Sequence, residues 1–222
     1  MIKYLTVILL VFSAINVNAQ AGAKGLGTND PEAKKILDAV STKFKSFSTV
    51  KGNFSLEVKD AAGKTQGTKK GTVYMKGVKY RVTITGQEIF CDGKNVWTYD
   101  KSANEVQVAQ FEQNGSAITP QKLFTNFYDK DFLYKLNGEK KVGSKTYQEI
   151  ELTPVDKTKP FFKVLVSVDK ASKLINSTQV FEKNGNRYTY AMSNIVTNTA
   201  IGDDMFAFDA KKYPGVEVID LR

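Results

Sequence analysis

Short runs in which apolar and polar residues alternate, divided by turn-forming residues, constrain the fold of this chain more than any other feature. Residues 54–58 and 78–84 show the period of two that is typical of a half-buried strand. Further candidate strands lie at 87–91, 95–99, 105–110, 132–141, 145–152, 161–168, 173–183 and 186–198. The turn signals between them are Ala62-Gly63-Lys64, Lys76-Gly77, Asp92-Gly93, Asn137-Gly138 and Asn184-Gly185. About eleven strands with short connections predict an antiparallel meander.

Two segments have helical rather than strand character. Asp30 can cap a helix that begins at Pro31, and the apolar residues that follow at helical spacing are Ile36, Leu37, Val40, Phe44 and Phe47. A second, short helix is expected after Thr119-Pro120, within the insertion 113–130. We expect the two helical segments to pack against the concave face of a curved sheet and so close it.

The first residues have the pattern of an export signal. Lys3 precedes an apolar run from Leu5 to Ile15, and the small residue Ala19 ends an A-x-A-like cleavage motif. A membrane-spanning helix is the alternative, but it needs about 20 apolar residues, more than this run offers. The sequence therefore predicts a signal peptide at 1–19, a glycine-rich flexible leader at 20–29 and a single domain at 30–222.

The chain is basic, with 32 Lys and Arg against 23 Asp and Glu. Only Arg81, Arg187 and Arg222 are arginines, and lysine lacks the bidentate fork that reads phosphates and bases, so nucleic acid is disfavoured. Two interpretations remain: a solvated surface with charged strand edges, or attraction to an anionic membrane. The single cysteine, Cys91, excludes an internal disulfide and is expected to be a small buried side chain.

The residue inventory disfavours catalysis. The chain has no histidine, which excludes imidazole-based triads and the commonest zinc ligand. Acid–base catalysis by carboxylates stays open in principle, with the candidates Asp92, Asp100, Asp156, Asp169, Asp203 and Asp204. The first four stand in turns, where aspartate usually serves the backbone, and Asp203-Asp204 suits a weak cation site or a cap. We expect no enzyme activity, no cofactor and no metal.

Aromatic side chains cluster around the Asp92-Gly93 hairpin, and such residues can either fill a core or line a cavity. The order and spacing of several segments then resemble the outer-membrane lipoprotein carrier family, LolA-type proteins of the periplasm. The segments are 47–54, 71–76, 79–82, 92–100, 119–124, 150–154 and 206–216. In 92–100 a D-G-K hairpin precedes Trp-x-Tyr, and 119–124 is similar to the short lid helix of the family.

The resemblance implies an incomplete β-barrel of about eleven strands, with helices over a concave apolar face that encloses a cavity for acyl chains. It implies a monomeric periplasmic carrier that takes lipoproteins from an inner-membrane ABC transporter toward the outer membrane. Because each buried methylene contributes about 0.8 kcal/mol, acylated proteins need such a portable apolar environment. The residues expected to form the cavity or lid are Tyr80, Val82, Ile84, Trp97, Tyr99, Leu123, Phe124 and Phe127.

One departure from the family pattern leaves alternatives open. Many carriers have an Arg-Pro pair after the lysine that matches Lys76, and its arginine fastens the lid, whereas Gly77-Val78 follows here. Lid closure then rests on apolar contacts, or the cargo is another amphiphile such as a glycolipid or lipid precursor. A third possibility is a non-catalytic envelope sensor module with the same fold and a filled interior.

Overall fold

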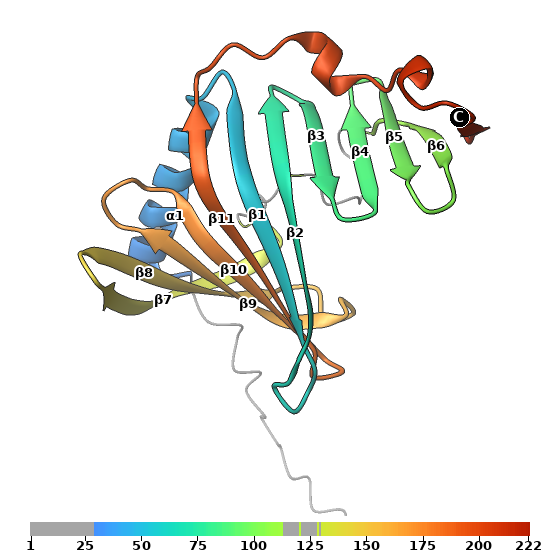
Figure 1. The fold of residues 1–222 in the computed structure, drawn as a ribbon. Coiled ribbons are helices and arrows are strands. Elements are labelled where there is room, and N and C mark those ends of the chain that lie inside the picture. The colour runs from blue at the N-terminus through green and yellow to red at the C-terminus, as the bar shows by residue number, and fades with distance from the viewer. Residues whose placement is uncertain (1–28, 113–119, 121–127, 129) are drawn as a thin grey trace, which may run out of the picture.

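A computed structural model describes residues 29–112, 120, 128 and 130–222, in which one α-helix packs on a single open sheet (Figure 1). The helix is α1 (Pro31–Lys45). The strands are β1 (Val50–Lys59), β2 (Thr65–Lys76), β3 (Lys79–Ile84), β4 (Gln87–Cys91), β5 (Asn95–Asp100), β6 (Glu105–Gln110), β7 (Phe132–Val142), β8 (Lys145–Pro154), β9 (Phe161–Asp169), β10 (Ile175–Glu182), β11 (Arg187–Thr197) and β12 (Glu217–Asp220).

The sheet has the order β12-β6-β5-β4-β3-β2-β1-β11-β10-β9-β8-β7. All neighbours are antiparallel except β12, which runs parallel to β6. The ends β12 and β7 do not pair with each other, so the predicted open antiparallel barrel is confirmed. The ten candidate strands are present as β1 and β3 to β11. The alternation did not reveal β2, of which only 71–76 entered the resemblance, or β12.

Turn chemistry was predicted correctly at four of the five sites. Residues 62–64, 76–77, 92–93 and 184–185 lie in or beside the connections β1–β2, β2–β3, β4–β5 and β10–β11. Asn137-Gly138 was expected to be a turn, and this is wrong: the pairing of β7 with β8 shifts between Leu136 and Gly138, which makes it a bulge inside β7. Gly138 has a φ of 127°, a conformation that only glycine adopts without strain.

The predicted start of the helix is confirmed, and the capping residue Asp30 also joins the helix to the edge of the sheet. The Asp30 carboxylate accepts hydrogen bonds from the backbone N–H groups of Glu32 (2.8 Å) and Ala33 (3.4 Å), which caps α1. Its other oxygen accepts from the N–H of Leu136 on β7 (3.0 Å). Asn29 accepts from the N–H of Tyr134 in the same way. The edge strand β7 is thereby partly covered.

Strand register divides the sheet into an inner and an outer face. Across β3, β4 and β5 the pairs Tyr80↔Cys91 and Cys91↔Val96 lie on one face, and the other face carries Arg81, Phe90 and Trp97. The first face is the inner one, since α1 packs there against β7–β10. A first core cluster joins α1 to these strands through Ala33, Leu37, Val40, Phe132, Tyr134, Ile150, Leu152, Val164, Val166 and Val168.

A second core cluster fills the inner face of β1–β4. Its buried members are Val50, Val73, Met75, Tyr80 and Cys91. Cys91 is fully buried, as expected for a small apolar side chain, and burial raises the pKa of its thiol. The single sheet therefore carries two apolar clusters side by side.

Residues 199–216, which we call the C-terminal strap, cross the outer face of β3–β6 (Figure 1). Its Phe208 and Tyr213 rings stack at 4.5 Å between centroids and pack against Tyr99. Asp203 accepts hydrogen bonds from the ammonium groups of Lys76 (2.8 Å) and Lys79 (2.7 Å). These two lysines hold the pKa of Asp203 down, at about 2.

Aspartates in turns behave largely as expected. Asp92, Asp100, Asp156 and Asp169 each accept hydrogen bonds from backbone N–H groups two or three residues later. Asp203 instead forms ion pairs, and the short helix Asp203–Phe206 has no side-chain cap, so the expected cap role is wrong.

Among the described residues, no helix is both long enough and apolar enough to cross a membrane. The expected signal peptide, residues 20–28 of the expected leader and most of the expected lid helix, including Leu123, Phe124 and Phe127, lie outside the described residues.

Candidate functional site

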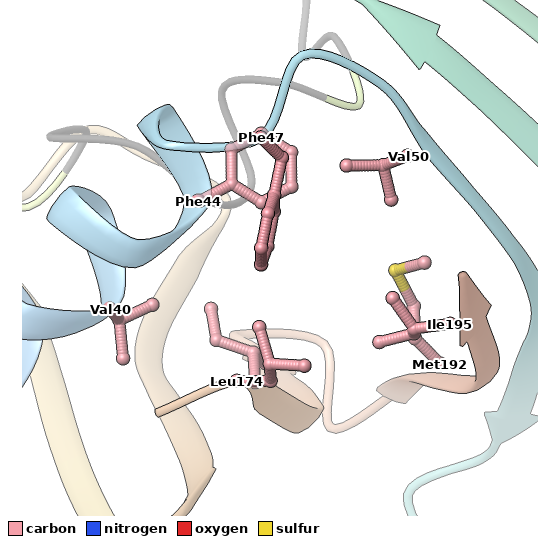
Figure 2. A pocket seen from close by; sticks show the side chains of 8 residues that line it. Val40, Phe44, Phe47, Val50, Leu174, Met192 and Ile195 are labelled. Atoms are coloured by element: carbon pink, nitrogen blue, oxygen red, sulfur yellow. The ribbon is translucent and has the colours of Figure 1, made fainter. Parts of the chain in front are cut away.

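The apolar seam between the two clusters contains a pocket (Figure 2). Helix α1 and the residues after it contribute Val40, Phe44 and Phe47 to its wall. The sheet contributes Val50, Ile175, Met192 and Ile195, and Leu174 comes from the connection just before β10. All eight lining side chains are apolar, so the pocket offers no group for acid–base or metal chemistry and suits hydrocarbon.

Two local features of the sequence place these side chains. Helix α1 ends at Lys45, and the Ser46 hydroxyl donates to the Lys43 carbonyl (2.7 Å), so Phe47 leaves the helix and turns toward the sheet. The Phe44 and Phe47 rings then meet edge to face at 6.3 Å between centroids. Figure 2 shows both rings beneath the end of the helix.

The second feature is a bulge in β11. The pairing of β1 with β11 shifts between Lys51 and Asn53, and Asn194 opposite has a φ of 52°, which asparagine tolerates better than most residues. The extra residue brings Met192 and Ile195 to the same inner face, although they are three positions apart. Without the bulge, Ile195 would point to the outer face.

The pocket is almost closed. Its free volume is about 10 Å³, which is the space of about one water molecule. The resemblance implied a cavity that already has room for acyl chains, and the seam as described does not have that room. A hydrocarbon chain must therefore displace side chains, and the unbranched Met192 is a flexible member of the wall.

Beyond the pocket, the inner face continues as an apolar strip toward the far ends of β1 and β11. Its half-buried members are Leu56, Val58, Val180, Tyr188 and Tyr190. Burial raises the pKa of the Tyr190 phenol, which marks a poorly hydrated surface. The strip extends the pocket along the strands.

Three of the predicted site residues lie on the inner face of β3. Tyr80 is 6% exposed and belongs to the second core cluster, and Val82 packs against that cluster. Ile84 is half-buried on the same face, opposite Gly71. Burial and the neighbouring Cys91 raise the pKa of the Tyr80 phenol, so it stays neutral.

Trp97 and Tyr99 do not share that wall, and their assignment to it is corrected by the strand register. Trp97 pairs with Phe90, and Tyr99 pairs with Glu88, on the outer face. Tyr99 packs under the strap, 4.6 Å from the Tyr213 ring centroid, and its hydroxyl donates to the Asn104 side chain (3.0 Å). Alternation shows that Trp97 and Tyr99 share a face without showing which face is concave.

Phe44 and Phe47 were predicted as apolar helix positions but not as site residues, and Met192 and Ile195 were not predicted at all. The available signal was the amphipathic helix itself, since its apolar face must meet the sheet. The Asn194 bulge has no comparable signature in a single sequence.

Residues 45–209 match the model of the family described as outer membrane lipoprotein carrier protein LolA. The chain belongs to this family. LolA-like proteins are periplasmic carriers or binding modules rather than enzymes. A search of curated proteins found no match to this LolA-family chain.

A solved structure of an uncharacterized conserved protein from Thermus thermophilus shares the fold. It is 12% identical, with a TM-score of 0.57 over 85% of this chain and 99% of that one. Two further structures are similar at lower scores. A LolA superfamily protein from Nitrosomonas europaea is 16% identical (TM-score 0.42; 80% and 98% covered). A putative outer membrane lipoprotein-sorting protein domain from Vibrio parahaemolyticus is 13% identical (TM-score 0.43; 78% and 97% covered).

Proposed function

We propose that this LolA-family protein is a non-enzymatic periplasmic carrier that holds the acyl chains of lipoproteins between α1 and the inner face of the sheet. The observation that carries the proposal is the seam pocket, whose wall is entirely apolar and lies between α1 and the sheet. The lipoprotein cargo would come from an inner-membrane ABC transporter of the lipoprotein-releasing type and go to the outer membrane. Export would follow cleavage after Ala19.

The closed pocket fits a carrier that must also release its cargo. If the protein already contained a wide open cavity, acyl chains would bind with the full hydrophobic free energy of about 0.8 kcal/mol per methylene and would dissociate slowly. In a pocket that must open first, part of that gain offsets the cost of moving Phe44 and Phe47 away from the sheet. Binding is then weak enough to be reversed by an acceptor.

The inner residues Tyr80, Val82 and Ile84 would form the far wall once the seam opens, because they lie on the same face as the pocket. Leu123, Phe124 and Phe127 remain the proposed lid. Lys76, the lysine that precedes the family's latch position, donates to the Ile201 carbonyl (3.0 Å) and to Asp203, and so fastens the strap.

The proposal is tested by placing an amide in the pocket. In Phe47→Gln, an unpaired amide would face hydrocarbon at a cost of about 1–3 kcal/mol, so a fluorescent triacyl lipopeptide should bind roughly tenfold more weakly. The matched control is Phe162→Gln, the same change at a phenylalanine that is 50% exposed on the outer face. Fluorescence anisotropy at a monomeric lipopeptide concentration measures both affinities.

Equal affinities for the two variants would overturn the proposed site. A complete lack of lipopeptide binding by the unchanged protein would overturn the carrier function. The narrowness of the pocket would then favour the sensor module, whose interior needs no space. Binding of a free glycolipid in place of the lipopeptide would identify the cargo as another amphiphile.

A further inference from the structure

Three connections meet at one end of the sheet, and together they are strongly basic. The β10–β11 turn contacts the β1–β2 turn, since a Cβ added at Gly185 would lie 2.5 Å from the Ala61 Cβ. The N–H of Lys183 donates to the carbonyl of Pro160 in the β8–β9 connection (2.9 Å). Figure 1 shows the β1–β2 and β10–β11 hairpins reaching the lower end of the sheet. We call residues 59–65, 155–163 and 181–187 the three-turn end; they include seven basic and three acidic residues.

The outer face of the three-turn end carries a row of cations around phenylalanine. Lys163, Phe181, Arg187 and Lys59 are cross-strand partners from β9 to β1. The Lys163 ammonium lies 4.4 Å and the Arg187 guanidinium 5.7 Å from the centroid of the Phe181 ring. Phe162, which is 50% exposed, packs against the same ring at 6.3 Å.

The positive charge of this row is not balanced nearby. Within the part of the chain that the structure describes, neither Lys163 nor Arg187 has a carboxylate within ion-pair distance, whereas Lys59 pairs with Glu57 (3.2 Å). Two nearby carboxylates are engaged locally: Asp156 accepts from Thr158, and Glu182 accepts from Asn184. The row therefore offers two cations and an exposed aromatic ring to an anionic partner.

We propose that the three-turn end docks on an anionic lipid bilayer, with Phe162 at the headgroup level and Lys163 and Arg187 on lipid phosphates. Aromatic rings beside cations suit the interface of a membrane, where one part of the surface is apolar and the other charged. The combination favours lipid, because a phenylalanine ring can enter the apolar boundary of a bilayer while the neighbouring cations stay with the phosphates. The strands that carry this row also carry the inner apolar strip, so docking would place the end of the strip near the bilayer.

The test uses residues 20–222, the chain expected after cleavage of the signal peptide. It measures co-sedimentation with vesicles of equal parts phosphatidylglycerol and phosphatidylcholine. Two variants address the two components: Phe162→Ser removes the exposed ring, and the pair Lys163→Gln with Arg187→Gln removes the charge. Each should weaken binding at least fivefold, and added salt should weaken binding of the unchanged protein. Vesicles of pure phosphatidylcholine should bind poorly.

The matched control is the triple variant Lys140→Gln, Lys141→Gln and Val142→Ser, which removes two exposed lysines and a 55% exposed valine from the β7–β8 hairpin. It should bind the vesicles like the unchanged protein, and thermal melting checks that every variant folds. Equal losses in the control, or no binding to anionic vesicles at all, would overturn the proposal. So would binding to polyglutamate without binding to vesicles, which would assign the row to an acidic protein.

The docking surface is independent of the proposed cargo. Lipopeptide binding in the absence of vesicles should be unchanged in the three-turn-end variants, because none of the substituted residues lines the pocket. Loss of vesicle binding with intact lipopeptide binding therefore separates a membrane-docking defect from a cargo defect.

Discussion

An ion pair between two side chains under the C-terminal strap stabilises the outer face of the sheet. The Arg81 guanidinium donates to Glu88 (2.7 Å) and lies over the Phe90 ring, 4.6 Å from its centroid. Burial alone would raise the pKa of Glu88, but hydrogen bonds and charge from Arg81 and Lys101 lower it overall. The Glu88 carboxylate therefore stabilises the fold above its ordinary pKa, and this contribution is lost as the pH falls through the lowered value.

Glu88→Gln should destabilise the protein by about 2 kcal/mol, because it leaves the Arg81 charge without its partner under the strap. Within the described residues, the Nε of Arg81 already has no hydrogen-bond partner, so other groups would hardly compensate for the loss of the Glu88 charge. Urea denaturation measures the free energy of unfolding of each variant. Glu57→Gln makes the same change in a more exposed pair, Lys59–Glu57, and should shift stability by less than about 0.5 kcal/mol. Similar effects of the two substitutions would contradict the role of the Arg81–Glu88 pair.

At the scale of the element, alternation predicted where strands run, and the residues around the fourth and fifth strands show its limit. The bounds of β4 and β5 followed from the sequence because Asp92-Gly93 divides two short runs that are rich in apolar residues. The face of Trp97 did not follow, since the period of two is the same for both faces. β12 was missed because its four residues only add to an existing edge, where no amphipathic pattern is required.

The C-terminal strap is itself an element whose attachment is expected to depend on pH. Asp203 has a pKa lowered to about 2 by Lys76 and Lys79, so its contribution is complete above its ordinary pKa and disappears as the pH falls toward about 2. Asp203→Asn should lower the melting temperature at neutral pH. The difference from the unchanged protein should shrink toward zero near pH 2, where a protonated Asp203 resembles asparagine.

Thermal melting between pH 7 and pH 2 follows this difference, and fluorescence of Trp97, on the outer face that the strap crosses, reports on the surroundings of β5. Asp204→Asn is the adjacent control, because within the described residues Asp204 forms no ion pair. A difference between Asp203→Asn and the unchanged protein that stays constant down to pH 2 would show that the lysine pairs do not fasten the strap.

At the scale of the whole molecule, one open sheet supports two apolar clusters, and α1 spans the line where they meet. The sequence predicted an amphipathic helix over a concave sheet, because the apolar residues of the helix need a surface to cover. It did not predict how tightly the helix closes on the sheet. Closure depends on the fit of Phe44 and Phe47 against β11, and that fit depends on the Asn194 bulge.

If the closed seam limits cargo entry, then enlarging it without adding a polar group should speed uptake. Met192→Ala removes a flexible side chain from the pocket wall and should cost about 1–2 kcal/mol of stability, because the site is only partly buried. Lowering the free energy of opening by about 1 kcal/mol would raise the rate of lipopeptide association about fivefold. Stopped-flow fluorescence measures this rate.

Leu152→Ala is the control: Leu152 is fully buried in the first cluster, away from the pocket wall, and its truncation should cost about 3 kcal/mol of stability. If Leu152→Ala sped uptake as much as Met192→Ala, general loosening of the fold rather than opening of the seam would control cargo entry.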